Sequence, residues 1–186
     1  MNDTIKTILE RRSTRRFKPE QIPLEDVETI IDCGLNAPSA VNAQNWHFSV
    51  VRDQKLIASM NAGIKEILPP ESRARMLSRY GGDENFSMFY GAPTVVVVSG
   101  DGSDSYSAAN CAFAAENICL AAQSLGVSSC VIGMAQLLFS GPDAAEYQSR
   151  LKTPRGYNVQ YAVALGYPAM QMERPERLAG RVDYFE

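Results

Sequence analysis

The residues that could do chemistry begin near the N-terminus, with three arginines and two hydroxyls in succession. Arg11, Arg12, Ser13, Thr14 and Arg15 follow an expected short helix and precede an extended stretch. Guanidinium groups bind phosphate through paired hydrogen bonds, and hydroxyls can hydrogen-bond the polar edge of a ring. The same residues would also suit a solvated basic surface or a nucleic-acid patch. Residue types alone favour these last two interpretations.

A second polar group lies where an expected helix gives way to an expected strand. Residues 37–48 read APSAVNAQNWHF, in which Ser39, Asn42 and Gln44 stand among small neighbours. Small side chains let the backbone approach a flat ligand, and amides offer donors and acceptors to its edge. The alternative is a plain connector between a helix and a strand.

The sequence gives little support for hydrolytic or metal-dependent chemistry. His47 is the single histidine, and the sequence contains neither a Gly-x-Ser-x-Gly turn nor paired histidine ligands. We interpret His47 as a structural residue whose polar atoms are satisfied, and we expect no catalytic side chain and no metal site. Gly81-Gly82 and Gly100-Asp101-Gly102 are isolated turn signals, since the chain has no P-loop and no dinucleotide-binding glycine motif.

Taken in order, the motifs resemble the FMN-dependent nitroreductase superfamily. The N-terminal basic-basic-Ser-x-basic pattern is followed about 25 residues later by A-P-S-x-x-N-x-Q-x-W-H-F. Gly91-Ala92-Pro93 precedes an apolar strand, and residues 114–133 match the central helix, turn and strand of the family. Residues 163–168 match the end of its last strand, and Arg174 and Arg177 lie where many members carry a basic pair.

The resemblance implies one domain over residues 1–186, an α+β sandwich with a central mixed sheet flanked by helices. It also implies a homodimer with swapped tails and two FMN sites between the subunits. The implied cofactor-binding residues are Arg11, Arg12, Ser13 and Arg15 for the phosphate, ribityl chain and pyrimidine edge; Pro38, Ser39, Ala40 and Asn42 from the other subunit; Ile132 and Gly133 beside the reactive flavin nitrogen; and Arg174 and Arg177 at the phosphate.

The function implied is reduction of nitro compounds, quinones or related small-molecule acceptors by NADH or NADPH, with ping-pong hydride transfer. A flavin supplies the redox chemistry, which agrees with a chain that offers no acid–base pair. Two alternatives stay open within the resemblance: a flavin-binding or storage protein without turnover, and a flavoenzyme of the same fold that oxidises or modifies another substrate. A nucleic-acid arm at the N-terminus is the alternative outside it.

Three departures from the family pattern bear on substrate and electron donor more than on flavin binding. Asn45 replaces the proline expected before Trp46, and Val131 stands where an aromatic residue is common. The segment that covers the substrate is confined to Ile64–Met88.

Composition indicates the compartment and the partners that we expect for the protein. The net charge of −3 argues against a general nucleic-acid partner, and no apolar run approaches the ~18 residues of a membrane span. The N-terminus carries no apolar signal core. Cys33, Cys111, Cys119 and Cys130 form no Cys-x-x-Cys pair and are expected to be reduced core residues. We therefore expect a cytoplasmic protein with no membrane partner.

The motifs must be positioned by helices and strands that alternate irregularly. Helices are expected at Thr4–Arg11, from Pro23 to Gly34, from a cap at Asp53 to about Lys65, from a cap at Ser103 or Ser105 to Leu125, and over Pro142–Leu151. Strands are expected at Trp46–Val51, Thr94–Ser99, Val127–Ile132 and Val159–Leu165. Pro69–Glu84 is expected to be a mobile surface excursion. The helix ending near Leu125 is apolar nearly all round, and the tail from Pro168 has no core of its own, so both are expected to need another surface.

Overall fold

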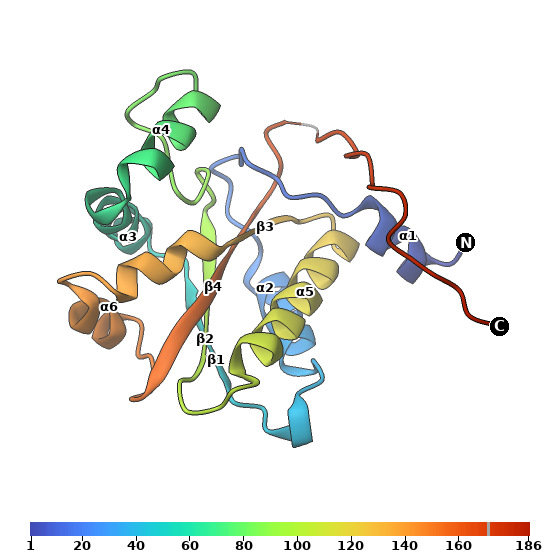
Figure 1. The fold of residues 1–186 in the computed structure, drawn as a ribbon. Coiled ribbons are helices and arrows are strands. Elements are labelled where there is room, and N and C mark those ends of the chain that lie inside the picture. The colour runs from blue at the N-terminus through green and yellow to red at the C-terminus, as the bar shows by residue number, and fades with distance from the viewer. Residues whose placement is uncertain (171) are drawn as a thin grey trace.

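Four antiparallel strands form the centre of the fold, in the spatial order β1-β2-β4-β3 (Figure 1). This computed structural model describes residues 1–170 and 172–186. The strands are β1 (Trp46–Val51), β2 (Thr94–Asp101), β3 (Ser128–Ile132) and β4 (Tyr157–Gly166). The expected α+β class is confirmed, but the expectation of a mixed sheet is wrong for these four strands, because each neighbouring pair is antiparallel.

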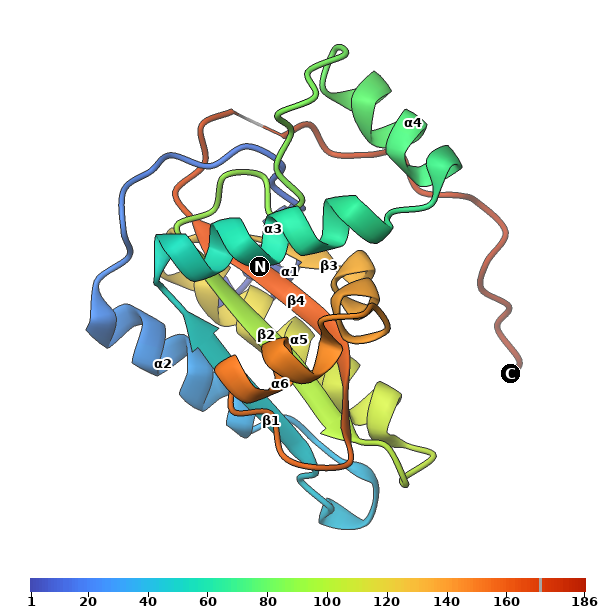
Figure 2. The ribbon, with the colours of Figure 1, turned by 90° about the vertical axis from the view of Figure 1, so that its left-hand side faces the viewer.

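Both faces of the sheet are buried, which explains the apolar run in β2. Val95 and Val97 pack into one core cluster, whereas Val96 and Val98 pack into the other. Figure 2 shows α3 and α6 over the face turned to the viewer, with α2 and α5 behind the sheet. The sequence of β2 therefore reads as continuously apolar because helices cover it on both sides.

The layer of α2 (Leu24–Leu35) and α5 (Ser107–Ser124) follows the expected helices closely. Gly34 permits their close contact, because a Cβ there would lie 2.7 Å from Ile118 Cγ1. Gly126, with φ of +74°, ends α5 as expected. The expected serine cap is wrong: the carboxylate of Asp104 accepts a hydrogen bond from Tyr106 N at 2.8 Å, just before the helix.

The opposite layer consists of α3 (Gln54–Ile67), η2 (Gly133–Phe139) and α6 (Ala144–Arg150). Asp53 caps α3 as expected, since its side chain accepts from Lys55 N at 2.8 Å. The excursion expected over Pro69–Glu84 instead contains a helix, α4 (Pro70–Arg79). Proline is favoured in the first turn, and Met76 of this helix is 2% exposed, so α4 rests on the core.

Both ends of the chain carry exposed apolar residues. The short helix α1 (Asp3–Glu10) forms as expected, yet Ile5, Ile8 and Leu9 are exposed. The tail after Pro168 has no helix or strand in its described residues and runs outward from the sheet (Figure 1). No helix among the described residues is long and apolar enough to cross a membrane.

The cysteines are free, but they do not all lie in the core. Cys111, Cys119 and Cys130 are buried, whereas Cys33 is exposed on α2, so its expected core placement is wrong. Cys33 lines an open hollow between α1, α2 and α5, so its side chain stays uncovered although Ile30 and Gly34 beside it are buried.

Candidate functional site

The arginine-rich segment lies along the edge of the sheet, beside β3. Thr14 N donates to Ser129 O at 2.9 Å, and Ser13 forms a parallel bridge with Ser129. Phe17 N donates to Tyr90 O at 3.2 Å, which continues the attachment. The backbone of this segment is thus fixed at the strand that leads to Ile132 and Gly133.

The four residues expected to bind the cofactor from this segment differ in their contacts. Arg11 Nε lies 3.3 Å from Glu116 Oε1 of α5, and that nitrogen is buried without a hydrogen-bond partner. Arg12 Nη1 donates to the carbonyls of Leu9 and Arg11, both at 2.7 Å, at the end of α1. Ser13 is half-buried and Arg15 is exposed. Because Nη1 of Arg12 is engaged, its Nε and Nη2 are the nitrogens left for a ligand.

Arg15 lies against a cluster of aromatic side chains. Tyr80 and Tyr90 stack with centroids 6.3 Å apart and ring planes at 11°. Burial raises the pKa of Tyr90, and the positive charge of Arg15 acts in the opposite direction. Burial likewise raises the pKa of Cys130, again opposed by Arg15. These phenol and thiol groups are therefore neutral near pH 7 and leave the arginine charge available for an anion.

Gly133 follows β3 and is open on its outer side. It is exposed, its φ is not positive, and a Cβ built on it would meet nothing within 4 Å. Within this chain, then, neither backbone conformation nor packing requires a glycine here. A flat group lying against the backbone would require one.

The connector between α2 and β1 contains a short 3-10 helix, η1 (Ala40–Asn42), in a strained backbone. Val41, Asn42 and Gln44 have φ of 48°, 56° and 47°, and Val41 is 99% exposed. Left-handed backbone is costly for a β-branched residue and is concentrated at functional sites. The shape of the connector must therefore be imposed by its contacts.

Those contacts form a polar network that the sequence did not reveal. Ala40 N donates to Asn110 Oδ1 at 3.0 Å, and Asn110 Nδ2 donates to Asn45 Oδ1 at 3.0 Å. Asn45 Nδ2 donates to Asp104 in turn. Asn45, expected to be only a departure from the family pattern, thus joins the connector to the start of α5. The polar breaks in the apolar run of α5 were the available signal, since Asn110 is one of them.

His47 differs from its expected role as a satisfied structural residue. Its Nδ1 is buried without a hydrogen-bond partner, and burial lowers its pKa. It lies on β1, in a groove that also includes Arg52, Arg150 and Lys152.

One chain brings together only part of the expected site. Residues 11–15 join Ile132 and Gly133 through the backbone contacts to β3, whereas the connector precedes Trp46 at the other end of the sheet (Figure 1). Trp46 pairs with Gly100 and Gly100 with Asn158, while Ser129 pairs with Leu165. Asn158 and Leu165 are seven residues apart on β4, so the two parts of the site are offset by about 23 Å along this strand. Arg174 and Arg177 lie on the exposed tail, with no hydrogen bond or ion pair among the described residues.

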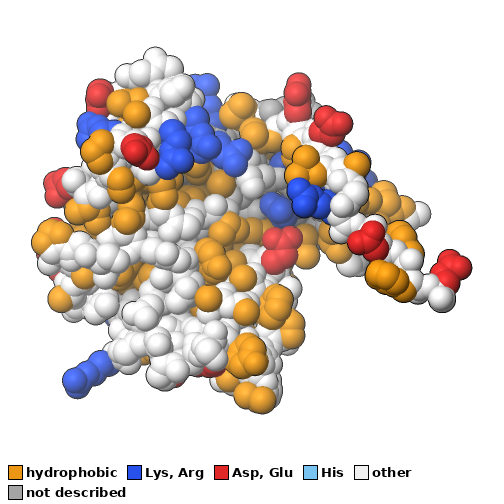
Figure 3. Space-filling model, in the orientation of Figure 1, with side chains coloured by type: hydrophobic (Ala, Val, Ile, Leu, Met, Phe, Trp, Pro, Cys, Tyr) orange, Lys and Arg blue, Asp and Glu red, His pale blue; other side chains and the backbone are white. Residues whose placement is uncertain are grey.

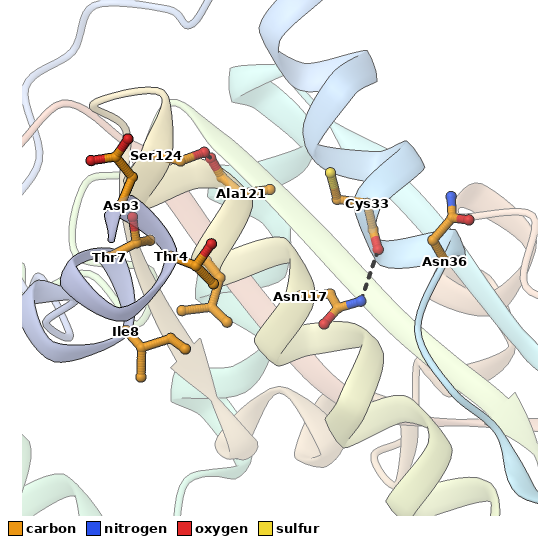
Figure 4. Close-up of a pocket in the computed structure, with 10 residues that line it drawn as sticks. Asp3, Thr4, Thr7, Ile8, Cys33, Asn36, Asn117, Ala121 and Ser124 are labelled. Carbon is orange, nitrogen blue, oxygen red and sulfur yellow. Dashed lines mark hydrogen bonds between the residues drawn. The ribbon is translucent and has the colours of Figure 1, made fainter. Parts of the chain in front are cut away.

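A separate hollow of about 430 Å³ lies between α1, α2 and α5 and contains none of the expected cofactor residues. Figure 4 shows Asp3, Thr7 and Ile8 of α1 on one side of this hollow. Asn117 of α5 donates to the Cys33 carbonyl of α2 at 3.1 Å on the other. Its walls are mainly apolar, so it resembles an incompletely covered core more than a polar binding site.

Comparison with known proteins identifies the family and the fold. A nitroreductase from Desulfitobacterium hafniense, solved with bound FMN, is 32% identical, with a TM-score of 0.91 and coverage of 100% of both chains. A Methanothermobacter thermautotrophicus protein, provisionally named NADH dehydrogenase/NAD(P)H nitroreductase, is 31% identical over 90% of this chain and 78% of its own. Iodotyrosine deiodinase from Thermotoga neapolitana is 28% identical over 85% of this chain and 84% of its own. The Nitroreductase family matches residues 8–167, so the chain belongs to the nitroreductase family.

Proposed function

We propose that this chain is an FMN-dependent oxidoreductase, in which NADH or NADPH reduces a small-molecule acceptor such as a nitro compound or quinone. The observation that carries the proposal is the open backbone at Gly133, beside a segment in which Arg12, Arg15 and Arg16 form no ion pair among the described residues. The FMN bound to the Desulfitobacterium hafniense nitroreductase supports the choice of cofactor.

The residues present fit FMN because they offer positive charge in one part of the site and open, flat backbone in another. Arg11 is ion-paired with Glu116 through Nε, so its terminal guanidinium nitrogens would be the ones that hold a phosphate or ring oxygen. Ser13 adds a hydroxyl, and the backbone at Ile132 and Gly133 offers a flat, open surface. Arg174 and Arg177 would add positive charge at the phosphate. This arrangement suits a molecule that is anionic at one end and planar at the other.

FMN, when bound, supplies two-electron transfer between a nicotinamide and an acceptor. The chain has three tasks: to bind the phosphate, to present the ring with one face open, and to exclude water. Arginine donors at the polar ring edge would stabilise negative charge that develops there. Pro38, Ser39, Ala40 and Asn42 lie too far from Arg15 to act in the same subunit, so we assign them to the site of a second copy.

The decisive experiment is an absorbance spectrum of the purified protein, before and after anaerobic addition of NADH or NADPH. We expect a yellow protein with about one FMN per subunit, bleached by at least one donor. A yellow protein that neither donor bleaches would indicate flavin binding without turnover. A colourless protein that takes up no added FMN would reject the proposal.

Steady-state kinetics test whether donor and acceptor share one pocket. If each stacks on the same open ring face, they bind in alternation and give parallel double-reciprocal lines. Intersecting lines would show a ternary complex and reject the shared pocket.

The likeness to iodotyrosine deiodinase supports a second candidate function, reductive removal of halogen from a halogenated phenol. Iodide release from iodotyrosine by the dithionite-reduced protein, compared with nitro reduction under the same conditions, separates the two candidates.

A further inference from the structure

The helix α4 carries three arginines that are not equally neutralised. Arg73 forms an ion pair with Glu84, with Nη2 and Oε2 2.6 Å apart. In the part of the chain that the structure describes, Arg75 donates only to the Ser72 hydroxyl, at 3.0 Å. Among the described residues, neither Arg75 nor Arg79 lies within 4.0 Å of a carboxylate. Because they are one turn apart, their two exposed charges lie on one side of α4.

The end of α4 is fixed against the arginine-rich segment. Tyr80 follows Arg79 and stacks on Tyr90, whose carbonyl accepts from Phe17 N. Tyr90 has a φ of +59°, a left-handed backbone conformation that is strained for a residue other than glycine. The Tyr80 hydroxyl donates to Ser87 O at 2.9 Å and is therefore already engaged.

Arg79 directly precedes Tyr80, whose ring stacks on the Tyr90 ring beside Arg15. The charges of both arginines oppose the rise that burial causes in the pKa of Tyr90. Figure 3 shows Lys and Arg side chains gathered where α4 faces the N-terminal segment. The Tyr80–Tyr90 stack thus places the end of α4, with Arg79, beside the segment that carries Arg15.

We propose that Arg79 and Arg75 form an anion subsite beside the FMN site. The subsite would hold the carboxylate, sulfonate or phosphate of a molecule whose planar part stacks on the flavin. This inference rests on the proposed function and defines the charge of the ligand that the segment Ile64–Met88 selects. Two sources share this chemistry: an aromatic acceptor acid, and the extra phosphate that distinguishes NADPH from NADH.

Isothermal titration calorimetry on the oxidised, FMN-loaded protein tests the subsite without turnover. The ligand pairs are 4-nitrobenzoate with 4-nitrobenzyl alcohol, and NADP⁺ with NAD⁺, because each pair differs by one anionic group. The variants are Arg79→Gln and Arg75→Gln, with Arg79→Lys to retain the charge. Arg155→Gln is the matched control, since Arg155 is an exposed arginine in the turn before β4.

We expect Arg79→Gln to weaken the anionic member of at least one pair about 5- to 10-fold, as for a charge-assisted contact at a partly exposed site. The neutral or less charged member should change less than twofold, Arg79→Lys should recover part of the loss, and Arg155→Gln should have no effect. Loss with nitrobenzoate identifies the acceptor as the source of the anion, whereas loss with NADP⁺ identifies the donor.

Equal effects within both pairs, or no effect of either glutamine variant, would overturn the subsite. This failure is distinct from failure of the proposed function, which would appear as absent FMN or absent bleaching by a nicotinamide.

Discussion

Arg11, Arg15 and Arg16 are close in sequence but differ in their surroundings. Arg11 faces Glu116 of α5, Arg15 faces the Tyr90 phenol, and the side chain of Arg16 is exposed with no hydrogen bond among the described residues. We expect Arg11→Ala or Arg15→Ala to weaken FMN binding by roughly 1.5–3 kcal/mol, the usual cost of losing a charge-assisted hydrogen bond. Arg16→Ala is the control and should change affinity much less. Fluorescence titration of the apoprotein with FMN measures all three, and equal losses would indicate a diffuse basic surface.

At Gly133, the effect of an added side chain on FMN binding can be measured separately from its effect on protein stability. A Cβ at this position meets open space, so Gly133→Ala should leave the free energy of unfolding of the apoprotein unchanged or slightly raised. The same methyl group would lie where we place the flavin ring, and FMN affinity should fall by about tenfold or more. Urea unfolding of the apoprotein and an FMN titration give the two quantities. Unchanged FMN affinity would show that no ring lies against this backbone.

At the scale of elements, the connector depends on one side chain of α5. Asn110 is 1% exposed, accepts from Ala40 N and donates to Asn45. Its replacement by alanine leaves buried polar groups without partners, which costs about 1–3 kcal/mol. We expect Asn110→Ala both to lower the free energy of unfolding by this amount and to weaken FMN binding, because the strained backbone at Val41 loses its support.

Asn117→Ala is the matched control for this variant, since Asn117 lies on the same helix and donates one hydrogen bond to the Cys33 carbonyl. It should reduce stability without altering the connector. If Asn110→Ala loses stability but retains wild-type FMN affinity, the connector does not contribute to the cofactor site.

The same elements show how far the sequence could predict the structure. Trp46–Val51 and the end of α5 at Gly126 were predictable, because β-branched runs and glycine act through local backbone preference. Helix α4 was not, because only Met76 is buried in it and most of its other residues are polar. The motif residues 11–15 could be identified from their order along the chain. Their neighbours Tyr80 and Tyr90, and the Asn45–Asn110 network, depend on contacts between segments far apart in sequence.

At the scale of the whole molecule, apolar residues exposed in one chain indicate a partner surface. Phe113 of α5 is 51% exposed, and Leu178 and Phe185 of the tail are 75% and 95% exposed. Together with the hollow between α1, α2 and α5, they are the apolar surfaces on which we base the prediction of a second subunit. We expect a dimer that does not dissociate without unfolding. Analytical ultracentrifugation across a range of concentrations measures this, and a stable monomer loaded with flavin would contradict it.

Subunit complementation tests how the two ends of the chain share a site. If each FMN contacts Arg15 of one subunit and the connector of the other, then Arg15→Ala and the double variant Ser39→Ala/Asn42→Ala affect different halves of each site. In a heterodimer of these two variants, one site carries both defects and the other carries none. We therefore expect one FMN to bind per heterodimer with wild-type affinity, whereas each variant homodimer binds weakly at both sites. Differently tagged subunits, coexpressed and purified through both tags, allow the measurement by FMN titration. If both halves of a site came from one chain, every site in the heterodimer would carry one defect, and no binding at wild-type affinity would appear. The separation of about 23 Å along β4 favours the shared arrangement.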